Sequence, residues 1–139
     1  MKKHLRFSLF FVLALCSAGF AGAQVIIIAN PSIKVAEVAK SDLKDLFTGG
    51  SASLGGGHAT PVLLKTGATT AAFLSEYIGK DDTAFRASWR NLVFSGSATM
   101  PKTLDSDAAV VEYVAGNAGA VGYISKASPH EGVKVIAVQ

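Results

Sequence analysis

The run VIIIA at residues 25–29 places the strongest constraint on the fold of this 139-residue chain. It is continuously apolar and mostly β-branched, which is the pattern of a strand covered on both faces of its sheet. PVLLK at 61–65 has the same character. AVGYIS at 120–125 and VKVIAV at 133–138 are predicted as two further strands. A sheet built from such strands needs other elements packed on both of its faces.

Segments with helical spacing separate these strands, at about residues 41–47, 69–78, 81–93 and 105–115. Ser41 is predicted to cap the first segment, and Gly49-Gly50 to stop it. Strands separated by helices predict an α/β fold with helices on the faces of the sheet. The positions predicted to face the core are Leu43, Leu46, Phe47, Phe73, Leu74, Tyr77, Ile78, Phe85, Trp89, Leu92, Val93, Phe94, Val110, Val111 and Val114.

The first 23 residues have the three-part pattern of a secretory signal peptide. A basic head over residues 2–6 precedes an apolar stretch over 7–15, and Ala21-Gly22-Ala23 matches a cleavage site. The apolar stretch is too short to span a membrane, which takes about 20 residues. Cys16 follows a large residue, which argues against lipid attachment. We therefore expect a periplasmic or secreted domain over residues 24–139.

The charge balance changes once residues 1–23 are set aside. They contain three of the thirteen Lys and Arg residues and none of the ten acidic residues, so the domain at 24–139 is predicted to be neutral. This removes the electrostatic argument for binding nucleic acid or an anionic membrane. The single cysteine also lies in residues 1–23, so we expect one domain that is stabilised by its core rather than by disulfides.

The common nucleotide and enzyme motifs are not found in the sequence. The Gly-rich segment GGSASLGGGHAT at 49–60 has neither the P-loop ending nor the G-x-G-x-x-G spacing, and it predicts a hairpin or a surface loop. Ser51 is not part of a G-x-S-x-G motif. Acidic pairs at 42/45, 81/82 and 105/107 are predicted at helix starts, where they oppose the helix dipole. We expect no catalytic activity.

Two histidines follow the predicted signal peptide, His58 and His130. Each is predicted as an isolated surface residue, because neither has another ligand-type side chain at metal-binding spacing. The sequence therefore predicts neither a metal site nor a cofactor.

KTGATT at 65–70 is the strongest candidate site, since it lies between a predicted strand and a predicted helix. Free backbone N–H groups and the helix dipole together bind phosphate, sulfate or carboxylate at such positions. Gly67 would let the backbone approach a ligand closely. An ordinary helix start, with Thr66 or Thr69 as the N-cap, explains the same residues and is favoured when they are considered alone.

The order of the motifs carries more information than any one of them. VIIIANP, SDLKDLFTGG, TGATTAAFLSEYI, FRASWRNLVFSG and AGNAGAVGYIS, taken together, resemble the periplasmic phosphate-binding proteins of ABC importers, and above all their short single-lobe relatives. The resemblance runs from Val25 to about Ser125. It implies a single lobe of periplasmic-binding-protein type, with a mixed sheet flanked by helices.

The resemblance also implies a ligand site. In the large phosphate binders an Arg and then a Gly-Ser-Gly-Thr-Thr run precede the helix and hold the oxyanion. Here Leu63 stands at the Arg position and Gly67 at the serine position, so Lys65 is the nearby cation and lacks the planar fork of Arg. The implied ligand-binding residues are Lys65, Thr66, Gly67, Ala68, Thr69 and Thr70.

The implied function is recognition of phosphate or a similar small oxyanion, with ABC importer membrane subunits or another envelope protein as partner. The large binders close two lobes around the ligand. This chain resembles one lobe, so a partner or a second copy in a homodimer would have to close the site. The alternative is a ligand-free interaction module that keeps the fold and docks onto another envelope protein.

Overall fold

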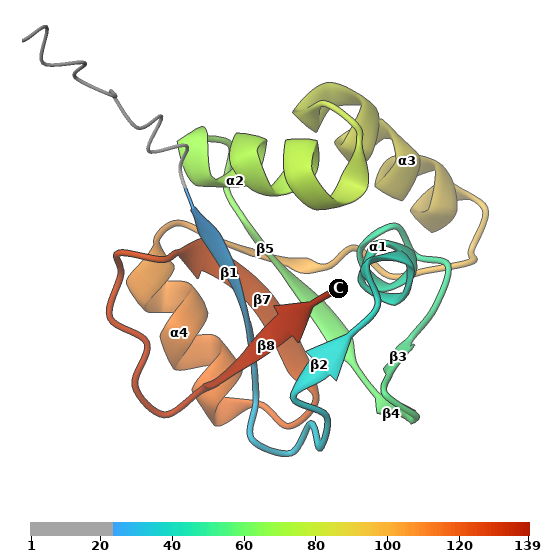
Figure 1. Ribbon diagram of the computed structural model, residues 1–139. Helices are drawn as coiled ribbons and strands as arrows, with labels where there is room; N and C mark the ends of the chain where they lie inside the picture. Colours follow the sequence, from blue (N-terminus) through green and yellow to red (C-terminus); the bar gives the residue numbers. More distant parts are fainter. Residues whose placement is uncertain (1–23) are drawn as a thin grey trace, which may run out of the picture.

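The computed structural model describes residues 24–139, and Figure 1 shows them as a sheet with helices packed on it. The predicted signal peptide and Cys16 lie outside the described residues. The six strands of the main sheet are β1 (Val25–Ala29), β2 (Glu37–Val38), β5 (Thr60–Leu64), β6 (Lys102–Leu104), β7 (Ala120–Ser125) and β8 (Lys134–Val138). The helices are α1 (Lys40–Phe47), α2 (Ala68–Phe73), the π-helix η1 (Leu74–Ile78), α3 (Asp82–Phe94) and α4 (Asp107–Gly116). A separate hairpin joins β3 (Ser53–Leu54) to β4 (Gly57–His58).

The main sheet is mixed, with the strand order β2-β8-β1-β7-β5-β6. β1 runs antiparallel to both β7 and β8, whereas β5 runs parallel to both β7 and β6. β6 and β7 follow one another in the chain but lie on opposite sides of β5, and α4 makes the crossover between them. This confirms the predicted α/β class with a mixed sheet.

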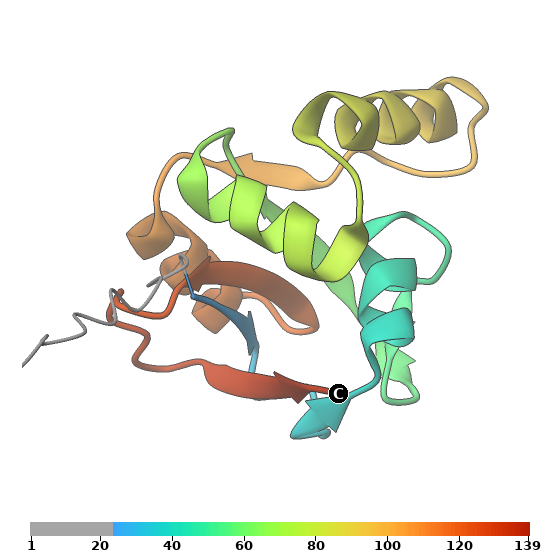
Figure 2. The same ribbon diagram turned by 45° about the horizontal axis from the view of Figure 1, so that its top comes forward.

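Two neighbouring residues of β7 show that helices cover both faces of the sheet. The ring of Tyr123 packs against Phe47 of α1 and Phe73 of α2. A Cβ atom added to Gly122 would lie 2.8 Å from Cγ1 of Val110 on α4. Because successive strand residues face opposite ways, α1 and α2 form one outer layer and α4 the other, as Figures 1 and 2 show.

Most of the predicted elements are present. The strand at 25–29 is covered on both faces as predicted, since Ile27 and Ile28 are both buried. The Gly-rich segment forms the β3–β4 hairpin. Asp81 caps α3, and its carboxylate accepts a hydrogen bond of 2.7 Å from the backbone N–H of Ala84. The predicted core positions on the helices are buried or packed against the core, with the exceptions of Val93 and Phe94.

Several predictions about the helices were wrong. α1 begins at Lys40, so Ser41 lies inside the helix and caps nothing. The start of α1 is held instead by a backbone hydrogen bond, which the N–H of Lys40 donates to the carbonyl of Gln139. Asp45 lies in the second half of α1 rather than at its start. Asp105 also lies outside a helix, because α4 begins at Asp107 after the Ser106 cap.

Two short strands were not predicted, and two residues were wrongly predicted to be buried. β2 and β6 have two and three residues, too few for a period to be visible in the sequence. Val93 and Phe94 were predicted in the core but are 41% and 91% exposed. They lie in the last turn of α3, beyond the part of the helix whose Phe85 and Trp89 reach the core.

The packing of α4 on the sheet requires a residue without a side chain at position 122. We expect Gly122→Ala to destabilise the fold by about 1–3 kcal/mol, because the added methyl group would collide with Val110. Gly116→Ala at the end of α4 is the matched control, since a Cβ there meets nothing within 4 Å. Urea unfolding measures both, and equal effects of the two substitutions would contradict this description of the packing.

Candidate functional site

The candidate site lies where β5 passes into α2. Lys65 continues β5 by one backbone hydrogen bond, from its N–H to the carbonyl of Leu104. Gly67 then occupies the N-cap position with φ 166° and ψ −173°, an extended conformation that any residue can adopt. The first hydrogen bond of the helix runs from Ala71 N–H to the carbonyl of Gly67. Neither Thr66 nor Thr69 caps the helix, so both cap predictions were wrong.

The first turn of α2 leaves backbone donors free. Within residues 24–139, the N–H groups of Gly67, Ala68 and Thr69 have no hydrogen-bond acceptor. These are the groups that any helix start leaves without an intrahelical partner. Gly67 and Ala68 are exposed and Thr69 is half-buried, so the three donors lie at the surface. The arrangement can donate hydrogen bonds to a small oxyanion.

The six predicted residues form one continuous turn, but Thr70 differs from the others. Its side chain is buried, with 1% of the residue exposed. Its hydroxyl lies 2.7 Å from the carbonyl oxygen of Lys65 and 3.1 Å from the hydroxyl of Tyr123. The backbone N–H of Leu64 donates to the same Tyr123 hydroxyl at 3.1 Å. Leu64 N–H can thus donate to Tyr123, Tyr123 to Thr70, and Thr70 to Lys65.

This network fixes the start of α2 to the sheet. The ring of Tyr123 stacks on Phe73 with the ring centroids 3.9 Å apart and an angle of 5° between the planes. Burial raises the pKa of the Tyr123 hydroxyl above its ordinary value of 10.0, and the hydrogen bonds from Thr70 and Leu64 oppose that rise. Tyr123 therefore stays neutral and keeps its donor proton at physiological pH.

Because the pKa of Tyr123 is raised in the folded protein, the free energy of unfolding depends on pH in the alkaline range. The unfolded tyrosine ionises near pH 10 and the folded one only at higher pH, so the contribution is fully present below pH 10 and is lost above it. We expect the free energy of unfolding to fall above pH 10, by at most about 1.4 kcal/mol per pH unit for this residue. Tyr123→Phe should make the slope shallower.

The same substitution should cost about 1–3 kcal/mol at neutral pH, because Leu64 N–H loses its buried acceptor. Urea unfolding at pH 7 to 11 tests both effects. Tyr77→Phe removes a second tyrosine whose pKa burial raises, so the two variants together separate the contribution of Tyr123 to the slope from that of Tyr77. A Tyr123→Phe protein with the same alkaline slope as the parent would contradict the assignment.

An ion pair next to the candidate site was not predicted from the sequence. Arg86 Nε lies 3.0 Å from both carboxylate oxygens of Asp82, and both side chains are about three-quarters buried. The hydroxyl of Thr66 donates to Asp82 Oδ2 at 2.9 Å. The four-residue spacing of Asp82 and Arg86 on a helix was the available signal. The hydrogen bond from Thr66 to Asp82 holds the start of α3 against the candidate site.

A hollow of about 460 Å³ opens beside this contact, between α2 and the segment that leads into α3. Its lining includes Thr66, Gly67, Lys80, Asp81 and Asp82. The volume lies within the range of small-molecule pockets.

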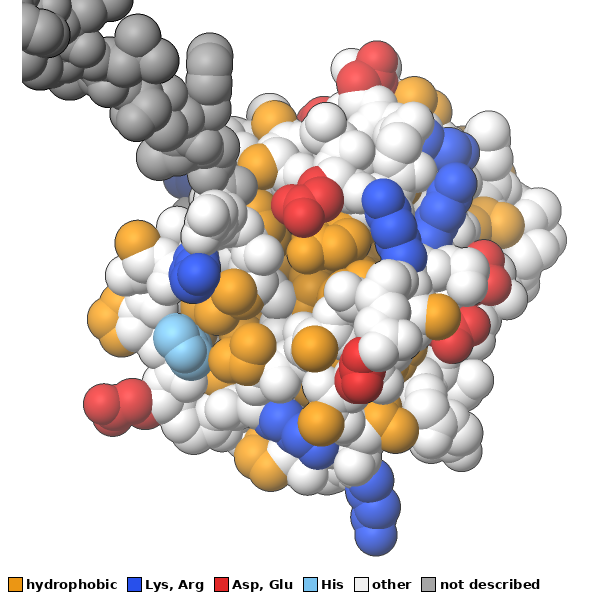
Figure 3. Space-filling view, in the orientation of Figure 1, with side chains coloured by type: hydrophobic (Ala, Val, Ile, Leu, Met, Phe, Trp, Pro, Cys, Tyr) orange, Lys and Arg blue, Asp and Glu red, His pale blue; other side chains and the backbone are white. Residues whose placement is uncertain are grey.

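Charges of both signs are interspersed on the face of the molecule that Figure 3 shows, so that face carries no field of a single sign.

The other predicted or excluded groups lie elsewhere. Leu63, at the position of the family's Arg, is buried in β5. His58 is exposed on β4 and His130 is half-buried near β8. Among residues 24–139, no group of three His, Cys, Asp or Glu side chains is arranged to hold a metal ion. No helix in the same part of the chain has the length and apolar character to cross a membrane.

Comparison by sequence gives no match to a protein-family model and none to a curated protein. Comparison by structure does. An ABC-type phosphate transport receptor from Vibrio cholerae matches with a TM-score of 0.61 and 19% identity, over 82% of this chain and 45% of that one. A putative phosphate ABC transporter substrate-binding protein from Clostridium perfringens, solved with bound phosphate, matches with a TM-score of 0.53 and 20% identity. This match covers 82% of this chain and 44% of that one. A possible phosphate-binding protein from Planctomyces limnophilus matches with a TM-score of 0.55 and 16% identity, over 83% of this chain and 41% of that one.

These matches confirm the resemblance at the level of the fold. The chain has the mixed sheet and flanking helices of the periplasmic phosphate-binding proteins, over most of its described residues. It spans less than half the length of each of the three solved structures. The fold is thus that of a single lobe of periplasmic-binding-protein type.

Proposed function

We propose that this protein is an exported, non-enzymatic substrate-binding-like protein that recognises phosphate or a similar small oxyanion for an ABC importer or an envelope sensor. The proposal rests on the turn at residues 65–70, which presents free backbone N–H groups at the surface of a fold shared with phosphate receptors. ABC importer membrane subunits are the proposed partners.

The residues of the turn divide into ligand-contacting and positioning groups in the proposed site. The backbone N–H groups of Gly67, Ala68 and Thr69 donate to the oxyanion, and the exposed ammonium group of Lys65 supplies positive charge. Thr70 does not touch the ligand in this scheme, because its hydroxyl is committed to Lys65 and Tyr123. It positions the turn instead.

Asp82 limits how tightly an anion binds. Its carboxylate lies 2.9 Å from the Thr66 hydroxyl at the edge of the turn, so it repels an anion bound there. Arg86 neutralises part of this charge through its Nε group. The turn is also open to solvent, which screens each contact. We expect a Kd for phosphate between roughly 10 µM and 1 mM.

Gly67→Ser should strengthen phosphate binding about tenfold, or by about 1.4 kcal/mol. The serine restores the hydroxyl that the phosphate binders have at this position. The backbone tolerates it, because φ is extended and a Cβ at residue 67 meets nothing within 4 Å. Isothermal titration calorimetry of residues 24–139 at low salt, with phosphate and sulfate, measures the change.

In the proposed site the Thr69 hydroxyl also donates to the oxyanion, so Thr69→Ala should weaken binding severalfold in the same titration. Thr60→Ala is the matched control, since Thr60 is exposed at the opposite end of β5. Absence of heat from the parent and from Gly67→Ser at millimolar phosphate would rule out the proposed site.

Asp82→Asn should also tighten binding, by about three- to tenfold, because it removes a negative charge beside the turn while keeping the shape of the side chain. Asp42→Asn on α1 is the control, since Asp42 is exposed and makes no contact with the turn. The gain should shrink as salt is added. A loss of affinity in Asp82→Asn would contradict the proposal that this carboxylate repels the bound anion.

A ligand-free interaction module is the second candidate. It is favoured by the absence of the family's Arg and Ser, whose positions hold Leu63 and Gly67. It is also consistent with a chain that spans less than half of each phosphate receptor. A protein that binds no oxyanion but captures an envelope protein would support this candidate over the first.

A further inference from the structure

Exposed apolar side chains lie at the end of α3 and in the segment that follows it. Four large hydrophobic residues are exposed among residues 24–139, and three of them, Val93, Phe94 and Met100, lie at or shortly after the end of α3. Phe94 is 91% exposed, so nearly the whole ring contacts solvent. Single exposed apolar residues are ordinary, but a cluster that contains an uncovered aromatic ring is typical of an interaction site.

A pocket of about 740 Å³ lies beside this cluster, and Met100 belongs to both. Trp89, Ala98, Pro101 and Tyr113 contribute apolar and aromatic surface to its lining. The pocket also includes Thr60 and Pro61 at the start of β5, whereas the oxyanion turn follows the end of β5. It is therefore a different place from the proposed ligand site, and this inference does not depend on that site.

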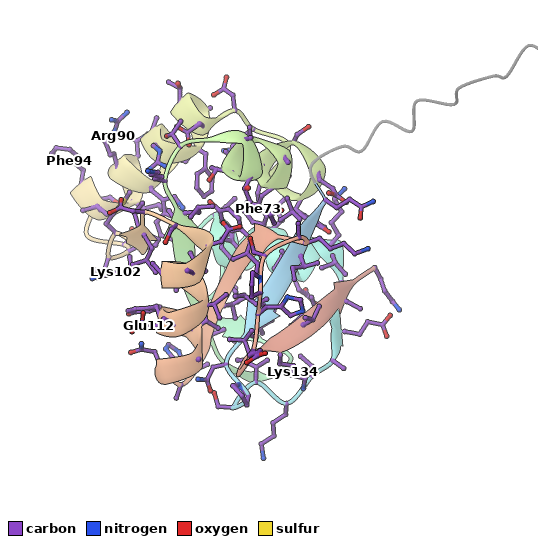
Figure 4. All side chains as sticks on the ribbon, turned by 90° about the vertical axis from the view of Figure 1, so that its left-hand side faces the viewer. Phe73, Arg90, Phe94, Lys102, Glu112 and Lys134 are labelled. Atoms are coloured by element: carbon purple, nitrogen blue, oxygen red, sulfur yellow. The ribbon has the colours of Figure 1, made fainter. Side chains whose placement is uncertain are left out.

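Charges of both signs surround the cluster and the pocket. Arg90, Lys102 and Glu112 are exposed, and the one ion pair among residues 24–139 joins Arg86 to Asp82, so none of the three has a charged partner. Figure 4 shows these residues and Phe94 along one side of the molecule, from Arg90 and Phe94 on α3, past Lys102, to Glu112 on α4. One end of this face is thus basic and aromatic, and the other end is acidic.

Such a face is complementary to a copy of itself. In a dimer with two-fold symmetry the same patch meets itself in the opposite orientation. The Arg90 and Phe94 end of one copy then lies over the Glu112 end of the other. Lys102, which lies between these two ends in Figure 4, is part of the pocket lining. We propose that this face forms a homodimer interface, in which Phe94 of each copy enters the pocket of the other and Arg90 pairs with Glu112 across the interface.

A second copy fits these observations better than a membrane does. A membrane-binding surface would pair the apolar cluster with basic residues alone and would have no use for a pocket. Here an acidic residue lies on the same face, and the pocket is large enough for an aromatic side chain such as the one beside it. An aromatic anchor in a desolvated pocket is also the usual centre of a protein interface.

Sedimentation velocity of the purified protein over about 1–200 µM tests the proposal. The parent is expected to dimerise in this range, and Phe94→Ser should raise the dimer dissociation constant at least about tenfold. Val135→Ser is the matched control, because Val135 is the fourth exposed hydrophobic residue and lies on β8. It should leave the dimer unchanged. Thermal unfolding should show that Phe94→Ser folds normally, since Phe94 packs on nothing in the monomer.

A charge reversal tests the orientation of the two copies. Arg90→Glu should weaken the dimer, and the double variant Arg90→Glu, Glu112→Arg should restore it. A parent that stays monomeric at about 200 µM would overturn the proposal, as would equal effects of Phe94→Ser and Val135→Ser. A monomer that instead co-floats with anionic phosphatidylglycerol vesicles would assign the face to a membrane and would likewise overturn it.

Discussion

The hydroxyl of Tyr123 makes the contacts on which the position of the turn at residues 65–70 depends. It accepts a hydrogen bond from the end of β5 at Leu64 and reaches Thr70 at the start of α2. The ring below it stacks on Phe73. A hydroxyl buried in an apolar layer is costly unless it is fully hydrogen-bonded, so few arrangements of strand and helix satisfy it. The free N–H groups of Gly67 and Ala68 are consequently held at one surface position.

Much of the fold could be predicted from the sequence because the strong signals are local. The β-branched run at 25–29, the helix start at Asp81-Asp82 and the Gly-rich hairpin each specify structure within a few residues. The errors arise where residues far apart in the sequence determine the structure. Ser41 could cap a helix, but the bond from Lys40 to Gln139 starts α1 earlier. Phe94 has the spacing of a core residue, but the core does not extend to the end of α3.

The sequence predicts which turn is the candidate site, but it does not predict the contacts that the residues of this turn make. The sequence placed six candidate residues in one turn, and the structure brings them together there. It could not show that Thr70 faces inward to Tyr123, 53 positions away in the chain. Nor could the sequence show that Asp82, which pairs with Arg86 on the next helix, accepts a hydrogen bond from Thr66. Both facts depend on how α2 and α3 pack, which periodicity within one helix does not determine. The two ends of β5 are thus assigned different proposed tasks, ligand recognition after Leu64 and self-association near Thr60.

The most direct measurement of the central claim is a phosphate titration followed by the backbone amide resonances of the protein. Recognition at the turn predicts saturable shifts of the Gly67, Ala68 and Thr69 amides, with the Met100 amide at the far pocket unchanged. Saturable shifts confined to other residues, or no shifts at millimolar phosphate, would contradict the proposal that these free N–H groups form the binding site.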